Sequence, residues 1–296
     1  MIADLSTTVA GMTLPSPVMT AAGCGGRELA AFTDLTALGA FVTRTVTLDP
    51  TAGWPTPRVA ETPSGLLSAT GLQNPGLQGF LASELPWFAQ QRVRTVVSVS
   101  GSTLGEYGEL SRRVGSSPGV SAIEVHLTTT DPYQTGKAVH VERRDAPRDL
   151  PVLVKLAPGA DVVDLAKAAV DNGADALVLV QGFPGLVIDP ATLRPALGRG
   201  VGLLSGPAVH ALALRCVWDV HLAMPDVPLV GVGGIRTGSD ALVMLAAGAS
   251  AVQLGSVLFH DPSAPSRVAD ELAAELSRHD ISGAADAVGL AHAERG

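Results

Sequence analysis

The sequence predicts an α/β protein folded as a single-domain (β/α)₈ TIM barrel over residues 1–296. Three observations predict this fold class: eight short apolar runs, helical segments between them, and a recurring glycine-ended junction from helix to strand. A length of 296 residues suits one such barrel, and no linker divides the chain.

The eight apolar runs are rich in Val, Leu and Ala and are almost continuously hydrophobic, which is typical of parallel strands buried on both faces. They lie near residues 18–22, 41–46, 95–100, 122–127, 152–156, 176–181, 229–233 and 251–255. Helical segments fill the gaps, for example 160–172 and 239–247. A doubly wound open sheet is the competing architecture.

The recurring junction appears at 38–42, 172–180 and 247–255, where a helix ends at glycine and a strand begins soon afterwards. Glycine ends helices because it adopts the left-handed conformation without a steric penalty. Three copies favour the closed barrel.

Two segments break this plan. Residues 48–76 form a long Pro/Gly-rich excursion after the second strand, and segments of this kind are functional or contain small extra strands. Residues 128–151 follow the fourth strand with weak helical periodicity, and we interpret them as an active-site loop.

Composition excludes several classes of function. The net charge is −8 and no basic cluster is present, so we expect no nucleic-acid partner. Two cysteines cannot form a four-thiolate site, and we expect no metal. The sequence has no apolar run of bilayer length and no signal-like start, so we expect a cytoplasmic protein with no membrane partner.

Glycines near the C-terminus indicate a phosphate site. GVGGIRTGSD (231–240) and VQLGSVLF (252–259) place Gly233, Gly234, Gly255 and Ser256 where strands end. Exposed backbone N–H groups at such turns bind anions, and the loops after strands seven and eight are the usual phosphate grip of barrels. The alternative is that these glycines are merely turn residues.

Three further positions lie at predicted strand ends. Lys155 in VLVKLAPG is embedded in an apolar strand, where an ammonium must pair with an acid or serve a ligand. Gly206 in LLSGPAV could add another backbone N–H to the phosphate. Gly23 in GCGG could let a planar ring approach the backbone.

Together these segments resemble the class 1 dihydroorotate dehydrogenases, which are FMN enzymes with a (β/α)₈ fold. The resemblance covers nearly the whole chain and is most specific at TPRVAETPSGLLSATGLQNPG (56–76), LPSPVMTAAGCGG (14–26) and GASAVQLGSVLFHDP (248–262). It implies FMN as cofactor, with contacts at Ala21, Ala22, Gly23, Lys155, Gly206, Gly233, Gly234, Gly255 and Ser256. The resemblance also implies a homodimer and, in some members, an electron-transfer subunit.

The substrate side departs from the family pattern. The family's fourth strand ends in a run like N-x-S-C-P-N with Cys as general base, whereas this chain has HLTTTD, with Thr129 at the Cys position. A hydroxyl is a weaker base than a thiol because its pKa is far higher. The family's substrate contacts map onto Arg44, Ser68, Gly71, Leu72 and Gln181, where Arg44 replaces a Lys and both Ser68 and Gln181 replace Asn.

The candidate catalytic residues are Thr129, His126, Lys155, Asp131 and Tyr133. His126 titrates near neutrality and could act as acid, base or orienting donor, or it could be structural. Asp131 could be a base or could cap a turn with Pro132, and Tyr133 could donate a proton. Arg44 could bind a substrate carboxylate or pair with a neighbouring acid.

We therefore expect an FMN-dependent oxidoreductase that moves a hydride between flavin and a carbon next to a carbonyl, on a small molecule other than dihydroorotate. One alternative is a dihydroorotate dehydrogenase with Thr129 as an atypical base. A second alternative is a non-catalytic FMN-binding or assembly protein.

Overall fold

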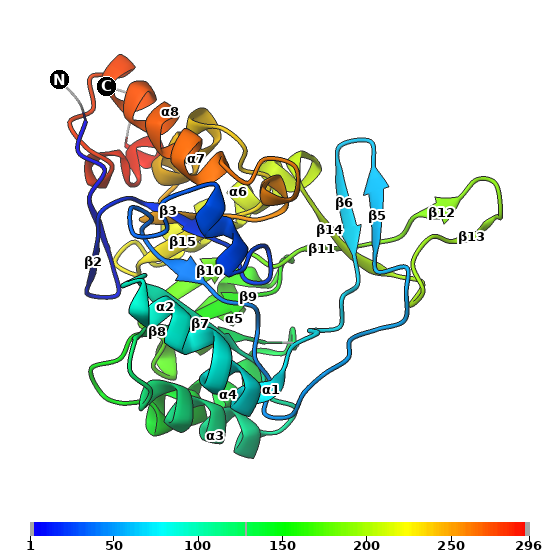
Figure 1. The fold of residues 1–296 in the computed structure, drawn as a ribbon. Helices are drawn as coiled ribbons and strands as arrows, with labels where there is room; N and C mark the ends of the chain where they lie inside the picture. The colour runs from blue at the N-terminus through cyan, green and yellow to red at the C-terminus, as the bar shows by residue number, and fades with distance from the viewer. Residues whose placement is uncertain (1–2, 128, 294–296) are drawn as a thin grey trace.

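Eight parallel strands form a barrel at the centre of the computed structural model, which describes residues 3–127 and 129–293. Figure 1 shows the strands surrounded by helices. Their hydrogen-bonded order is β3-β16-β15-β10-β9-β8-β7-β4, and the backbone hydrogen bond from Gly39 N to Val18 O, at 2.9 Å, joins the two ends. The strands are β3 (Val18–Thr20), β4 (Phe41–Val42), β7 (Thr95–Val99), β8 (Val120–His126), β9 (Val152–Leu156), β10 (Ala176–Leu179), β15 (Leu229–Val232) and β16 (Ala251–Leu254).

Helices follow the strands and cover the outside of the barrel. The longer ones are α2 (Leu85–Gln90), α3 (Leu104–Gly115), α4 (Pro132–Asp145), α5 (Val162–Asp171), α6 (His210–Ala223), α7 (Gly238–Ala246) and α8 (Ala264–Arg278). Shorter turns are η1 (Arg27–Ala31), α1 (Gly76–Gly79), η2 (Phe80–Glu84), η3 (Pro207–Val209), η4 (Ser256–Phe259), η5 (Ala285–Ala287) and η6 (Leu290–His292). Within the described ranges, no helix combines the length and apolarity needed to span a membrane.

Two hydrophobic cores hold the barrel together. Side chains alternate between the two faces of a strand, so Ile123 and Val125 on β8 pack outward against helices, whereas Ala122 packs inside the barrel. The hairpin of β1 (Thr7–Val9) and β2 (Met12–Leu14) adds Val9 and Leu14 to the inner core, both 0% exposed. This hairpin therefore closes the amino-terminal end of the barrel.

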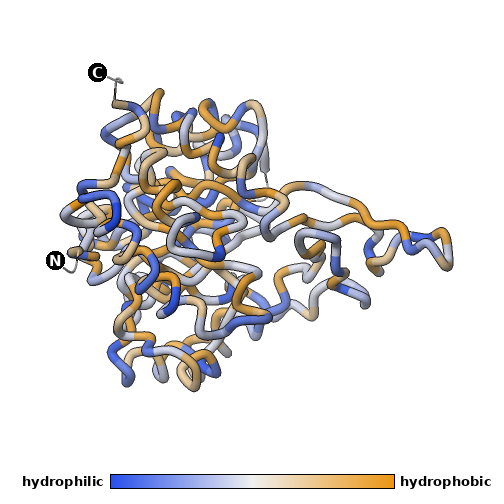
Figure 2. The backbone as a smooth tube through the Cα atoms, turned by 90° about the horizontal axis from the view of Figure 1, so that it is seen from above, coloured by the Kyte–Doolittle hydropathy of each residue, from blue (hydrophilic) through white to orange (hydrophobic). Residues whose placement is uncertain are grey.

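A second sheet lies beside the carboxyl end of the barrel. It is antiparallel, in the order β11-β14-β6-β5, and joins β5 (Val59–Thr62) and β6 (Gly65–Ser68) to β11 (Phe183–Gly185) and β14 (Gly202–Ser205). Between β11 and β14, a hairpin of β12 (Ile188–Asp189) and β13 (Arg194–Pro195) projects from the molecule. Residues 186–201, which we call the arm, carry hydrophobic residues along this extension (Figure 2).

The barrel and all eight strands are confirmed, with ends that differ by a few residues. The excursion 48–76 contains β5 and β6. In contrast, most of the segment 128–151 is the regular helix α4, where we expected a loop. Its periodicity was weak because the buried positions of α4 include Thr135, Gly136 and Glu142. The arm was not predicted.

Candidate active site

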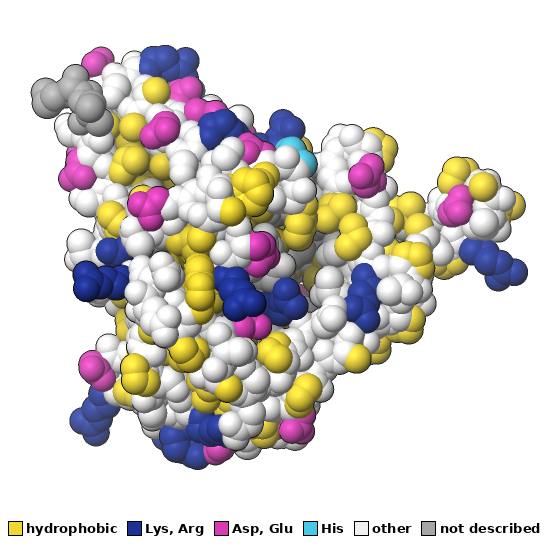
Figure 3. All heavy atoms as spheres, in the orientation of Figure 1, with side chains coloured by type: hydrophobic (Ala, Val, Ile, Leu, Met, Phe, Trp, Pro, Cys, Tyr) yellow, Lys and Arg dark blue, Asp and Glu magenta, His cyan; other side chains and the backbone are white. Residues whose placement is uncertain are grey.

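Two adjoining cavities open at the carboxyl ends of the barrel strands. Their volumes are about 430 Å³ and about 440 Å³, and Leu66, Ser256 and Phe259 line both of them. Cavities of ~300 to ~1,000 Å³ are typical of small-molecule sites. Figure 3 shows the surface hollowed between the barrel and the sheet that contains β5 and β6. The two cavities together form one extended site.

Lys155 on β9 lies in the floor of the first cavity and is 6% exposed. Its Nζ donates a hydrogen bond to Gln253 Oε1 at 2.8 Å and lies 3.6 Å from Glu124 Oε1. The sequence left two interpretations open, an ion pair or a role toward a ligand. The lysine has the acidic partner and also faces the cavity.

His126, the last residue of β8, also lines the first cavity. Burial lowers the pKa of its imidazole to about 4, and the positive charge of Lys155 acts in the same direction. The ring is therefore neutral near pH 7, so that one of its nitrogens can accept a proton.

The loops after β14, β15 and β16 surround the second cavity, which Gly206, Gly234 and Ser256 line. Gly234 has a φ of +70°, and a Cβ there would lie 2.7 Å from His210 Cβ and 2.8 Å from Gly206 O. This close approach explains why the position requires glycine. Gly233 is not among the described residues that line either cavity, and a Cβ there would lie 2.6 Å from Ala213 Cβ on α6.

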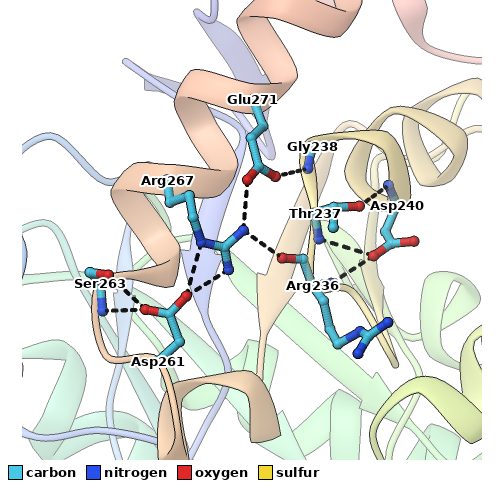
Figure 4. A network of polar contacts seen from close by, with 8 residues as sticks. All are labelled: Arg236, Thr237, Gly238, Asp240, Asp261, Ser263, Arg267 and Glu271. Atoms are coloured by element: carbon cyan, nitrogen blue, oxygen red, sulfur yellow. Dashed lines mark hydrogen bonds and ion pairs between the residues drawn. The ribbon is translucent and has the colours of Figure 1, made fainter.

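A polar network on α8 holds the loop after β15 in place (Figure 4). Arg267 donates to Asp261 Oδ2, to Glu271 Oε1 and to the backbone carbonyl of Arg236. Glu271 Oε2 in turn accepts a hydrogen bond from Gly238 N at 2.8 Å. Because the backbone of residue 236 is bound, the loop is fixed while the Arg236 guanidinium points away from the network.

Arg236 and His260 line the second cavity, and sequence reasoning missed both. Arg236 directly follows the GVGGI string, so its position after the seventh strand could have identified it. Sequence reasoning also missed Glu124 and Gln253, whose polar side chains occupy buried strand positions. Those positions could have been recognised as inward-facing from the alternation along each strand.

The remaining cofactor candidates gather as expected from the strand ends. Ala21, Ala22, Gly23 and Gly255 all line the first cavity. A Cβ at Gly23 would meet no atom within 4 Å, so the cavity is open above this backbone.

Three candidate catalytic residues lie elsewhere. Thr129 Oγ1 accepts a hydrogen bond from Asp131 N, and Asp131 Oδ1 accepts one from Tyr133 N, both at 3.0 Å. Asp131 is thus the N-cap of α4, as in the turn interpretation. Tyr133 is 65% exposed, with Lys137 Nζ 4.2 Å from its ring centre. None of the three is among the described residues that line the cavities, and Thr128 lies outside the described residues.

Most of the predicted substrate residues do come together. Arg44, Ser68, Leu72 and Gln181 line the first cavity, whereas Gly71 is not among its described lining residues. The side-chain amide of Gln181 donates to the backbone carbonyls of Leu127 at 2.7 Å and Lys155 at 3.2 Å. Arg44 is exposed at the cavity.

These residues fit FMN. Glycine turns with a nearby guanidinium suit a phosphate, and the open space at Gly23 beside a buried ammonium suits a flat, electron-accepting ring. The fold and the site thus define a flavin-dependent barrel oxidoreductase.

Comparison with known proteins agrees with this class. The model of the dihydroorotate dehydrogenase family matches residues 4–276. The protein named dihydroorotate dehydrogenase B (NAD(+)), catalytic subunit, from Geobacter sp. (strain M21) is 41% identical over 300 residues, which cover 97% of both chains. A protein of the same name from Pelobacter propionicus is 42% identical, and the match covers 97% of this chain and 98% of that protein. Another, from Anoxybacillus flavithermus, is also 42% identical, and the match covers 92% of this chain and 91% of that protein.

The chain belongs to the dihydroorotate dehydrogenase family. It is an FMN-dependent oxidoreductase that acts on CH–CH groups.

Proposed function

We propose that the chain oxidises dihydroorotate to orotate and passes the electrons through FMN and a separate electron-transfer subunit to NAD⁺. The observation that carries this proposal is the identity of 41–42% to proteins named as catalytic subunits of dihydroorotate dehydrogenase B (NAD(+)). Those matches extend over nearly the whole chain. A catalytic subunit implies a second subunit, which would be the electron partner.

Oxidation of a CH–CH group to C=C removes a hydride from one carbon and a proton from its neighbour. FMN would supply the hydride acceptor when bound. The protein must accept the proton, and His126 is our first candidate because its neutral ring lines the cavity. Thr129 is the second candidate, since the family resemblance puts it at the position of the base.

Arg44 is the candidate carboxylate ligand. Its guanidinium is exposed at the first cavity, and a guanidinium can bind a carboxylate through two parallel hydrogen bonds. Dihydroorotate has one carboxylate, so this contact would set its orientation toward His126.

The test is an anaerobic titration of the FMN-loaded protein with dihydroorotate, followed by the visible absorption of the flavin. We expect the absorption to bleach as the cofactor is reduced. If dihydroorotate leaves the spectrum unchanged while a chemical reductant bleaches it, this substrate assignment is wrong.

A second candidate function is oxidation or reduction of a CH–CH bond in a different substrate. The observation that favours it is that Gln181 uses its amide donors on backbone carbonyls, at 2.7 Å and 3.2 Å. Ser68 also replaces an Asn of the family and has a shorter side chain. Fewer hydrogen-bond donors therefore remain to bind a pyrimidine ring. Bleaching by another carboxylated CH–CH donor, but not by dihydroorotate, would support this alternative.

The arm supports the proposal of a homodimer. Its apolar side chains Leu186, Ile188, Leu193 and Val201 are 46–79% exposed, and exposed apolar patches mark interaction sites. An electron-transfer subunit must approach the cavities, whereas the arm projects away from the barrel (Figure 1), so we assign the arm to a second copy of the chain. Light scattering should show a dimer for the natural chain and a monomer for Leu193→Glu. A monomeric natural chain would contradict the assignment.

A further inference from the structure

Three polar side chains lie inside the barrel, at and beneath the floor of the first cavity. Glu124 on β8 is 0% exposed, Gln253 on β16 is 1% exposed, and Lys155 on β9 is 6% exposed. They come from three different strands, so the barrel itself brings them together.

Hydrogen bonds connect the three in a row. Lys155 Nζ donates to Gln253 Oε1 at 2.8 Å, and Gln253 Nε2 donates to Glu124 Oε2 at 2.7 Å. The other carboxylate oxygen, Glu124 Oε1, has no hydrogen-bond partner among the described residues and lies 3.6 Å from Lys155 Nζ. The carboxylate thus acts on the ammonium both directly and through the amide.

The arrangement places polar groups in an apolar interior. The inner core around it is apolar, with Ala122 on the same strand as Glu124 and Leu153 on the same strand as Lys155. A buried ion pair is often no more stabilising than apolar residues of similar volume. The position of the pair at the cavity indicates that it serves the ligand that binds there.

The two charges differ in their access to that ligand. Lys155 lines the cavity, whereas Glu124 is fully buried and is not among the described lining residues. A reduced flavin carries more negative charge than an oxidised one, so the ammonium favours the reduced form and the carboxylate opposes it. In a low-dielectric interior both effects are large.

We propose that Glu124 is a positioning residue that holds Lys155 in place, directly and through Gln253, and offsets its charge, so that this pair sets the reduction potential of the bound FMN. The inference concerns the cofactor and is independent of which substrate the enzyme uses.

The experiment measures the midpoint potential of bound FMN and the dissociation constant of oxidised FMN in three proteins: the natural chain, Glu124→Gln, and the double variant Glu124→Gln with Lys155→Gln. In Glu124→Gln the side-chain oxygen can still accept the bond from Gln253, but the ammonium charge is unopposed. We expect at least a tenfold shift toward the reduced form, which is about 30 mV for a two-electron couple.

In the double variant both charges are absent. Because Lys155 is the nearer of the two to the cavity, we expect its potential to fall below that of the natural chain. The double variant buries no unpaired charge, so it keeps the proposal testable if Glu124→Gln does not fold. The shift in Glu124→Gln should persist at ~1 M salt, since buried charges are poorly screened.

Glu142→Gln is the control for replacing a fully buried Glu by Gln, because Glu142 is as buried as Glu124 but lies on α4, outside the barrel interior. Its FMN potential should equal that of the natural chain. The proposal requires that Glu124→Gln has the highest midpoint potential, the natural chain the next highest and the double variant the lowest. Any other order overturns it. Loss of FMN binding in a folded Glu124→Gln protein also overturns it.

Discussion

Replacing Glu142 by glutamine removes a carboxyl group that the fold buries. Glu142 lies on α4 and is 0% exposed, and neither of its carboxylate oxygens has a hydrogen-bond partner among the described residues. Burial raises the pKa of this group to about 8. The Ser111 hydroxyl opposes this shift in part, and the negative charge of Asp145 adds to it. We therefore expect the substitution to alter how stability depends on pH.

The magnitude follows from the two pKa values. The folded protein keeps the Glu142 proton up to about pH 8, whereas the unfolded chain releases it near the ordinary value of 4.5. The stability that this group contributes is fully present below pH 4.5 and is lost as the pH rises through 8. At 1.36 kcal/mol for each pKa unit, the loss is about 5 kcal/mol, and glutamine does not incur it.

Urea unfolding between about pH 5 and about pH 9, at constant ionic strength, measures the effect. The free energy of unfolding of Glu142→Gln, minus that of the natural chain, should increase by several kcal/mol across this range. Glu109→Gln is the control, since Glu109 is a partly exposed residue of α3 that forms an ion pair with Arg112. Its free energy of unfolding should differ from that of the natural chain by a nearly constant amount across this pH range. A difference for Glu142→Gln that does not change with pH would refute the reasoning.

Three further predictions concern the site. His126→Asn should slow flavin reduction by substrate ~10²- to 10⁴-fold if the imidazole is the base. In the natural chain, the rate of flavin reduction should fall only as the pH drops through about 4. A decrease of threefold or less in His126→Asn would exclude this role. Gly234→Ala should weaken FMN binding at least tenfold in a fluorescence titration, because the new Cβ would lie 2.7 Å from His210 Cβ. Gly11→Ala is the control: Gly11 also has a positive φ, +77°, but has open space around it, so its replacement should leave the FMN affinity unchanged. Arg44→Met should raise KM for a carboxylated substrate by ~10- to 100-fold, the equivalent of one charge-assisted hydrogen bond, with a smaller change in kcat; an unchanged KM would show that the guanidinium does not bind substrate.

The barrel could be predicted from the sequence because strands that are buried on both faces consist of almost continuous runs of apolar residues. The helix α4 could not be, since Thr135, Gly136 and Glu142 occupy its buried face and disrupt the apolar stripe. The arm escaped prediction for another reason. Its strands β12 and β13 have two residues each, which is too short for any periodicity to show.

The site was predictable where it depends on strand ends. Lys155, His126 and Arg44 all line one cavity because parallel strands of a barrel open at the same edge. Thr129, Asp131 and Tyr133 are close to His126 in sequence, but the Thr129 hydroxyl and the Asp131 carboxylate accept hydrogen bonds from local backbone N–H groups, and Tyr133 is exposed. The partners of Lys155 are distant in sequence, and only the closed barrel brings Gln253 and Glu124 together.

The hairpin of β1 and β2 limits the directions from which molecules can approach the site. Because Val9 and Leu14 fill the amino-terminal end of the barrel, that end offers no route to the cavities, which lie at the opposite end. A substrate and a diffusible oxidant would both approach from the carboxyl ends of the strands, and we expect them to bind in turn. Steady-state kinetics with a small-molecule acceptor should accordingly give parallel double-reciprocal lines.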